Sequence, residues 1–229
     1  MATYFRDFSA GISDWTQRPA VSVNDAPTWA VQNTVEVIST SASNHLEALA
    51  WDDIDADGNR ATVEVYGMQK IPANTNSSSN RTCVVRMSTD ASATYYSVRL
   101  RPADVALYRG VGATQTQVAV QSITGGTAGE WWHYRLRANG SSFKVRVWED
   151  GGSEPGTWDI ETTDSTYSTA GYVGLFKGAN TNEHVWKKFG VGTNGDAAPT
   201  DAGGSLPTLT GITAGSITAS GATLTITAS

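Results

Sequence analysis

Three aspartates at alternate positions form the sharpest chemical motif in this chain. Asp53, Asp55 and Asp57 are followed directly by Gly58. Calcium takes about six to eight oxygen ligands, and carboxylates around a glycine turn can wrap one ion. Glu64 stands at the twelfth position of the calcium-loop pattern, but residues 63–65 alternate as a strand where the helical version needs a helix. The motif therefore predicts either a structural calcium ion or a solvated acidic hairpin turn.

Basic side chains form a second candidate group. Six of them alternate with apolar neighbours and should point away from the core: Arg99, Arg101, Arg135, Arg137, Lys144 and Arg146. If their strands share a sheet, they make a basic stripe that could dock an acidic partner surface or an anionic glycan. The alternative is a solvated sheet face paired with nearby Asp and Glu, which needs no function.

Tryptophans form the third group, and eight are many for 229 residues. Aromatic rings bind sugars through their apolar faces. Trp131, Trp148 and Trp158 are candidate contacts to carbohydrate or a partner, whereas Trp132 falls in the inward phase of its strand. Trp148 lies in the outward phase, and the alternative for it is a ring covered by the 154–155 loop together with Trp158.

Residue sets that catalyse reactions are not found, so we expect no enzyme. Glycosidases usually need two carboxyl groups about 5 to 10 Å apart, and the only alternating acids, at 53–57, lie in a turn. His45, His133 and His184 are isolated and lack metal-ligand spacing. We find neither a nucleophile elbow nor a phosphate loop. Apart from the candidate calcium, no cofactor is expected.

A β-hairpin must position most of these residues. Apolar and polar residues alternate over 132–137 and again over 142–148, on either side of Asn139-Gly140. Alternation around Asn-Gly is the strongest short-range hairpin signal in a sequence. Further short strands are predicted at 3–8, 45–51, 60–68, 81–87, 95–101, 105–109, 171–176 and 183–191.

Short strands separated by Gly, Ser and Asn favour an all-β fold, a two-sheet antiparallel jelly-roll sandwich with almost no helix. Hydrophobic residues make up 39% of the chain and charged residues 17%, a strand-and-turn composition. The net charge of −6 argues against nucleic-acid binding. The single cysteine, Cys83, excludes an internal disulfide and is expected to be a small buried hydrophobe.

Neither a signal peptide nor an apolar run of membrane-spanning length is found, so we expect a soluble protein that begins at its own initiator methionine. Residues 1–194 should form the sandwich. Residues 195–207, rich in Gly, Asp, Pro and Ala, read as an exposed linker. Residues 208–229 supply two or three strands, too few to be stable alone. They either open a second sandwich, resembling immunoglobulin-like or fibronectin-like modules, or pair with another subunit.

The order of motifs resembles the concanavalin A-like, or laminin-G-like, jelly-roll family, in the versions embedded in tailed-phage structural proteins. The resemblance covers residues 1 to about 194 and rests on Asp7-Phe8, Trp15, Leu49-Ala50-Trp51-Asp52, residues 131–137, Asn139-Gly140, residues 144–148, Glu154-Pro155-Gly156-Thr157-Trp158, residues 171–176 and residues 189–192. It implies a two-sheet sandwich, often with a concave sugar-binding face. Its glucanases carry a glutamate pair around an aspartate, which this chain lacks.

We therefore expect a noncatalytic bacteriophage virion protein, a capsid decoration, head-fibre or tail-fibre component. Its lectin-like domain would reinforce the particle or bind host-surface glycans. Expected partners are other virion proteins and further copies of the chain, with neither nucleic acid nor membrane insertion, and the expected location is the virion. Two alternatives stay open: a glycan-cleaving domain, and a secreted carbohydrate-binding domain of a bacterial protein.

Overall fold

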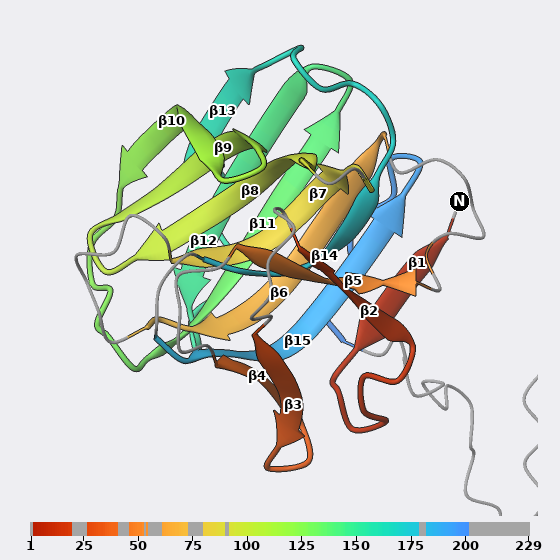
Figure 1. The fold of residues 1–229 in the computed structure, drawn as a ribbon. Coiled ribbons are helices and arrows are strands. Elements are labelled where there is room, and N and C mark those ends of the chain that lie inside the picture. Colours follow the sequence, from red (N-terminus) through yellow and green to blue (C-terminus); the bar gives the residue numbers. More distant parts are fainter. Residues whose placement is uncertain are drawn as a thin grey trace, which may run out of the picture.

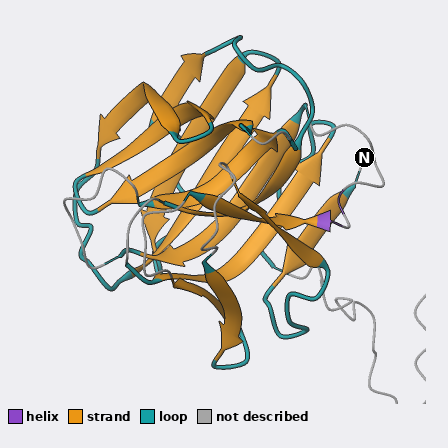
Figure 2. Cartoon of the chain, viewed as in Figure 1, coloured by secondary structure: helices purple, strands orange, loops and turns teal. Residues whose placement is uncertain are grey.

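The chain folds into two antiparallel β-sheets packed face to face (Figure 1). The computed structural model describes residues 2–19, 27–40, 46–52, 54, 61–72, 80–89, 92–178 and 182–201. Strands make up nearly all of the regular structure in these ranges, and the only helical element in them is a short 3₁₀ stretch at Asp52 and Ile54, after β5 (Figure 2). No helix in the described parts is long and apolar enough to cross a membrane. The predicted all-β sandwich is confirmed.

The first sheet, sheet A, has eight strands, and β6 lies between β11 and β15. Its spatial order is β13-β12-β11-β6-β15-β4-β3, and β1 also pairs with β15. In chain order the strands are β1 (Thr3–Arg6), β3 (Thr28–Gln32), β4 (Glu36–Thr40), β6 (Val63–Lys70), β11 (Trp131–Asn139), β12 (Ser142–Glu149), β13 (Ile160–Thr163) and β15 (His184–Thr193).

The second sheet, sheet B, has seven strands in the order β10-β9-β8-β7-β14-β5-β2. In chain order they are β2 (Trp15–Pro19), β5 (Glu47–Trp51), β7 (Arg81–Met87), β8 (Thr94–Arg101), β9 (Asp104–Val111), β10 (Thr114–Ser122) and β14 (Tyr172–Lys177). Long crossovers between the sheets bring strands from both ends of the chain together, as in jelly rolls.

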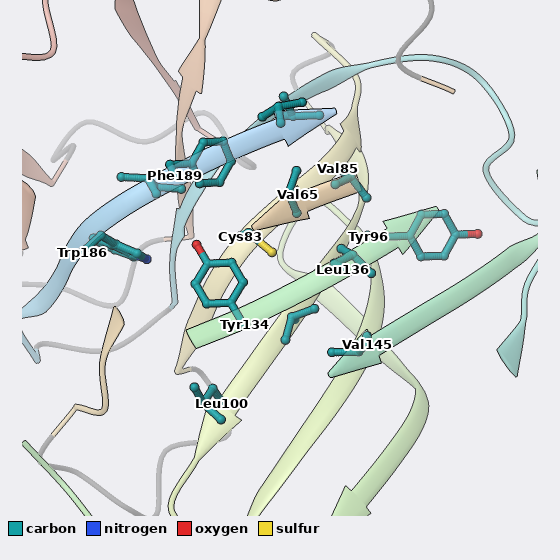
Figure 3. Close-up of a cluster of buried hydrophobic side chains, with 14 of the residues drawn as sticks. Val65, Cys83, Val85, Tyr96, Leu100, Tyr134, Leu136, Val145, Trp186 and Phe189 are labelled. Carbon is teal, nitrogen blue, oxygen red and sulfur yellow. The ribbon is translucent and has the colours of Figure 1, made fainter. Parts of the chain in front are cut away.

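The core lies between the sheets, where the inward half of each strand is buried. Tyr134 and Leu136 of sheet A gather with Cys83 and Val85 of sheet B (Figure 3). Cys83 is fully buried, as predicted, and burial raises the pKa of its thiol to about 12. Because side chains alternate along a strand, the residues between these inward positions must face the outside of the sandwich.

The predicted hairpin is confirmed. β11 and β12 pair in register from Trp132–Glu149 to Asn139–Ser142. Gly140 occupies the turn with a φ of +56°, a conformation that favours glycine. The six predicted basic residues do not all lie on one sheet. Arg99 and Arg101 lie on β8 of sheet B, whereas the other four lie on β11 and β12 of sheet A.

Residues 195–201, here called the docked segment, follow β15 and fold back onto the outer face of sheet A. Ala198 is only 3% exposed. The segment passes so close to β15 that a Cβ on Gly190 would lie 2.1 Å from the Pro199 carbonyl oxygen. The prediction of an exposed linker is therefore wrong around Ala198. The division into domains stays a prediction, and the tail at 208–229 lies outside the described residues.

Candidate functional site on the outer face of sheet A

An ionic cluster occupies the middle of this face, and we call Glu64, Arg135, Arg137, Arg146 and Glu154 the arginine network. Glu64 is buried and accepts hydrogen bonds from Arg135 and Arg137. Arg135 also donates from Nε and Nη2 to the two carboxylate oxygens of Glu154, over 2.7 and 2.9 Å. Burial alone lowers the pKa of Arg135, but hydrogen bonds to Glu154 and the charge of Glu64 outweigh it and raise the pKa.

Trp158 closes one side of the arginine network. Its ring lies 4.3 Å from the Arg146 guanidinium carbon and 5.2 Å from that of Arg137. Arg146 donates to the Pro155 carbonyl over 2.8 Å and pairs with Glu154. The 150–159 loop is thereby fixed onto the sheet, and the Trp158 ring is already held between two cations.

The docked segment closes another side. The Ala198 amide donates to Glu64 over 3.2 Å, and the Ala198 carbonyl accepts from Arg135 over 2.8 Å. Trp148 is 8% exposed and clusters with Tyr66 and Ala198. Three of the predicted cations, Arg135, Arg137 and Arg146, and two predicted tryptophans, Trp148 and Trp158, are thus brought together, but into a closed, ion-paired assembly.

The remaining predicted cations are also paired. Lys144 pairs with Glu161 over 2.5 Å at the exposed edge of sheet A. On the outer face of sheet B, Arg99 binds Asp104 over 2.7 Å and Arg101 binds the same carboxylate. These pairings match the alternative that the sequence left open, a sheet face whose charges are satisfied internally.

Trp131 lies at the end of β11, beyond the arginine network, and is partly exposed. Lys70 of β6 is its register partner, and the Lys70 ammonium lies 5.3 Å from the centre of the ring. The Lys187 ammonium of β15 lies at the same distance. A register shift between Trp186 and Lys188 interrupts the alternation, which lets both Lys187 and its neighbour serve this face. We call Trp131, Lys70, Lys187 and Lys188 the lysine corner.

His133 separates the two regions. Its ring stacks on Trp148 at 5.0 Å, its Nδ1 lies 2.7 Å from the Tyr66 hydroxyl, and its Nε2 lies 3.1 Å from Asp150. Burial lowers its pKa, more than the hydrogen bond to Asp150 raises it. The imidazole is therefore neutral at pH 7. Because the Asp150 carboxylate can only accept a hydrogen bond, we assign the ring proton to Nε2, which donates to Asp150.

Sequence reasoning identified Trp131 but missed all three lysines of this corner. Lys187 and Lys188 are adjacent, and an adjacent pair of charges gives no period-two signal. The two lysines share one face only because of the register shift in β15, and the sequence does not predict that shift. Two charged residues in a row, inside an otherwise apolar strand, are the one sign that could have pointed to a bulge.

A polar cavity of about 320 Å³ lies elsewhere, lined by Arg109, Ser141, Thr163, Asp164, Ser165 and Thr166. Partial burial raises the pKa of Asp164, but hydrogen bonds from Thr166, Tyr96 and Arg109 outweigh it and lower the pKa to about 2. The carboxylate is fully engaged, and the described lining contains no aromatic ring. The cavity is therefore a weaker sugar site than the lysine corner.

Glu47 is the described carboxyl group with the most catalyst-like environment. Burial raises its pKa to about 7, against the hydrogen bond that Trp29 Nε1 donates over 2.8 Å. Its side chain is nevertheless enclosed between the sheets, with 1% of the residue exposed. A general acid must reach the bond that it protonates. Glu47 cannot reach a substrate from this position, so we interpret it as a residue of the fold and not of a catalytic site.

The aspartates of the predicted calcium motif, Asp53, Asp55 and Asp57, lie outside the described residues. Within the ranges that the structure describes, no cluster of His, Cys, Asp and Glu could hold a metal ion. The structural calcium therefore stays a prediction from the sequence.

The chain matches no protein-family model, and no curated protein matches it in sequence. Solved structures resemble it in fold. The CBM2 module of the evolved Dit of Lactobacillus casei BL23 phage J-1 has a TM-score of 0.52 at 11% identity, over 84% of this chain and 96% of that one. A protein of unknown function from Shewanella oneidensis MR-1 has a TM-score of 0.51 at 12% identity, over 86% and 89%.

The carbohydrate-binding module CBM66 from Bacillus subtilis covers 78% of this chain and 91% of its own, with 16% identity and a TM-score of 0.48. At such identities, the similarities to the phage module and the Shewanella protein show the fold. The predicted jelly-roll architecture is confirmed by them, and what those proteins do is a separate matter.

Proposed function

We propose that this protein is a noncatalytic bacteriophage virion component whose jelly-roll domain binds carbohydrate. The observation that carries the proposal is the partly exposed Trp131, the aromatic ring of this face that the closed assembly leaves out. Sugar rings stack their apolar faces on such rings and present hydroxyls to neighbouring polar groups. The fold-similar CBM2 module of a phage Dit supports both the carbohydrate and the phage part of the proposal.

Binding without hydrolysis is the form of the function that the described carboxylates support. Glu64 and Glu154 are tied to arginines, Asp104 and Asp164 are likewise paired, and Glu47 is enclosed. Hydrolysis needs one carboxylic acid and one free carboxylate facing the same glycosidic bond. These five carboxyl groups do not supply such a pair, which favours adhesion over cleavage.

Within the virion, the domain would be a capsid decoration, head-fibre or tail-fibre module, attached through residues 195–229 to other virion proteins or to further copies of itself. Its partners would be those proteins and host-surface glycans. Nucleic acid and membrane insertion are not part of the proposal, in keeping with the net charge of −6.

A glycan array probed with the purified protein and with Trp131→Ala tests the binding function. We expect the wild type to bind a subset of glycans and Trp131→Ala to weaken that binding at least about fivefold, since a ring stacked on an aromatic side chain is typically worth about 1 to 3 kcal/mol. Trp158→Ala is the matched control, because Trp158 is also partly exposed on this face and also lies beside two cations, but these cations, Arg137 and Arg146, are fixed by ion pairs with Glu64 and Glu154.

Equal loss in both variants, or loss in Trp158→Ala alone, would move the site away from Trp131. Release of reducing sugar from a bound polysaccharide would replace the adhesion function by the glycan-cleaving alternative. Immunogold labelling of purified particles with an antibody to this chain tests the virion location, and particles free of label would favour the secreted bacterial module.

A further inference from the structure

The lysine corner gathers positive charges that have no acidic partner among the described residues. Three of the five lysines in the chain are gathered there: Lys70, Lys187 and Lys188. None of them forms an ion pair with a described residue. By contrast, Arg135 and Arg137 pair with Glu64 on the neighbouring strand β6, and Arg146 pairs with Glu154 of the 150–159 loop. The corner is therefore a positive site on a protein of net charge −6.

The three lysines are held close together by the sheet itself. Trp131 faces Lys70 across the β11–β6 ladder, and Met68, one pleat further along, faces both His133 and Lys188. Residues that share one face of adjacent strands are neighbours at about 5 Å. The ammonium groups of Lys70 and Lys187 both lie 5.3 Å from the Trp131 ring centre. A ligand stacked at this ring would thus meet two or three positive charges.

The surroundings do not cancel this charge. Two acids close to the corner in the chain are engaged elsewhere: the Asp150 carboxylate contacts His133 Nε2 at 3.1 Å, and the Glu130 carboxylate accepts a hydrogen bond from the Thr127 amide over 3.1 Å. His133 adds no positive charge at pH 7, because burial lowers its pKa. Positive charge near a surface ring attracts anions and loses this attraction as salt screens it.

We infer that the lysine corner selects anionic polysaccharides, sugar chains that carry carboxylate or phosphate groups, and this inference rests on the glycan-binding function proposed above. Trp131 supplies the platform for a sugar ring, and the lysines take the anionic substituents. A lysine ammonium is a mobile point charge, suited to either anion, whereas the planar fork of arginine demands one bidentate geometry. Specificity between carboxylate and phosphate is therefore left to the spacing of groups along the polymer.

The test uses the full chain on an array that holds neutral, uronate-bearing and phosphate-bearing glycans, together with single-stranded DNA as a polyanion that is no polysaccharide. The decisive variant is the triple substitution Lys70→Gln, Lys187→Gln and Lys188→Gln. An exposed charge contact at about 4 Å changes affinity about fivefold, so we expect the triple variant to bind acidic glycans at least about tenfold more weakly. Its binding to neutral glycans should be unchanged.

Two single variants provide a charge-matched comparison. Lys187→Gln and Lys144→Gln each remove one positive charge, but Lys144 lies on β12, outside the corner, and is paired with Glu161. Only Lys187→Gln should weaken acidic-glycan binding, and raised salt should weaken it in the wild type as well. All variants should keep the wild-type melting temperature, since they alter partly exposed side chains.

The outcomes separate the two proposals. A wild type that binds neutral glycans as well as acidic ones, or a triple variant that binds acidic glycans undiminished, overturns this inference and leaves the glycan-binding function standing. A wild type that binds no glycan overturns both. Single-stranded DNA bound as tightly as the acidic glycans, with the same dependence on the lysines, also overturns the inference, because the site would then be a general polyanion surface.

Discussion

The arginine network and the lysine corner lie on the same face of sheet A, and each combines a tryptophan with cations, yet they have opposite characters. In the network, Glu64 and Glu154 form ion pairs with all three arginines, and Trp158 and the docked segment cover them. In the corner, Trp131 and its lysines have no such acids or cover among the described residues. The difference teaches that neither the positive charge of a residue nor its outward position in a strand tells whether it has an internal ion-pair partner.

The physical reason lies in desolvation. A cation removed from water needs a partner of opposite charge within hydrogen-bonding distance, because an uncompensated buried charge is very costly. A partly exposed lysine keeps its water and needs none. The network therefore belongs to the stability of the fold, and the corner is free to serve a ligand.

The largest effect should come from Glu64→Gln. This change removes the shared negative charge from Arg135 and Arg137 at a buried position, which typically costs about 3 kcal/mol. Urea unfolding measures it, with Glu161→Gln as the control, because the Glu161 side chain is 56% exposed and pairs only with Lys144. A loss below about 1 kcal/mol in Glu64→Gln would mean that the network is no more structural than the corner.

Gly190→Ala should have an intermediate effect. Its Cβ would lie 2.1 Å from the Pro199 carbonyl oxygen, so the docked segment must shift off the sheet. We expect a destabilisation of about 2 kcal/mol, as for overpacked sites, and faster proteolysis between 195 and 201. Gly156→Ala is the control, since a Cβ there meets nothing within 4 Å. Unchanged proteolysis in Gly190→Ala would show that the segment does not cover the network in solution.

The smallest effect should come from Arg146→Lys, which keeps the charge but removes the planar group beside Trp158 and the hydrogen bond to Pro155. We expect a loss of about 1 kcal/mol, measured by thermal unfolding, and freer cleavage of the 150–159 loop. The reverse exchange on the same strand, Lys144→Arg, should leave the stability unchanged. If both variants were as stable as the wild type, the stacking of Arg146 on Trp158 would contribute no more to stability than an ordinary surface cation does.

Strands with clear alternation were the predictable part of the fold. Residues 81–87 match β7 in both bounds, and the hairpin of β11 and β12 follows from its alternation around Asn139-Gly140. The strands that sequence reasoning missed are β2, β3, β4, β10 and β13. Four of them have only four or five residues, too few for periodicity to emerge. β10, the outermost strand of sheet B, is largely exposed, so its apolar signal is diluted.

The outward phase of the candidate cations was also predictable, but their partners were not. Arg135 meets Glu64 from 71 residues away and the carbonyl of Ala198 from 63 residues away. Such contacts depend on which strands become neighbours and on where the chain returns. Alternation within one strand holds no information about either, so the sequence could not tell the paired arginines from the unpaired lysines.

The position of β15 has a mechanical consequence. This strand is bonded to β6 along one side and to β4 and β1 along the other. Tension applied to the chain beyond Asp201 must first detach Ala198 from Glu64 and Arg135, and must then shear two ladders at once instead of peeling one edge strand. Force arriving from that direction is therefore opposed by ladders on both sides of β15, whereas an edge strand would resist it with one.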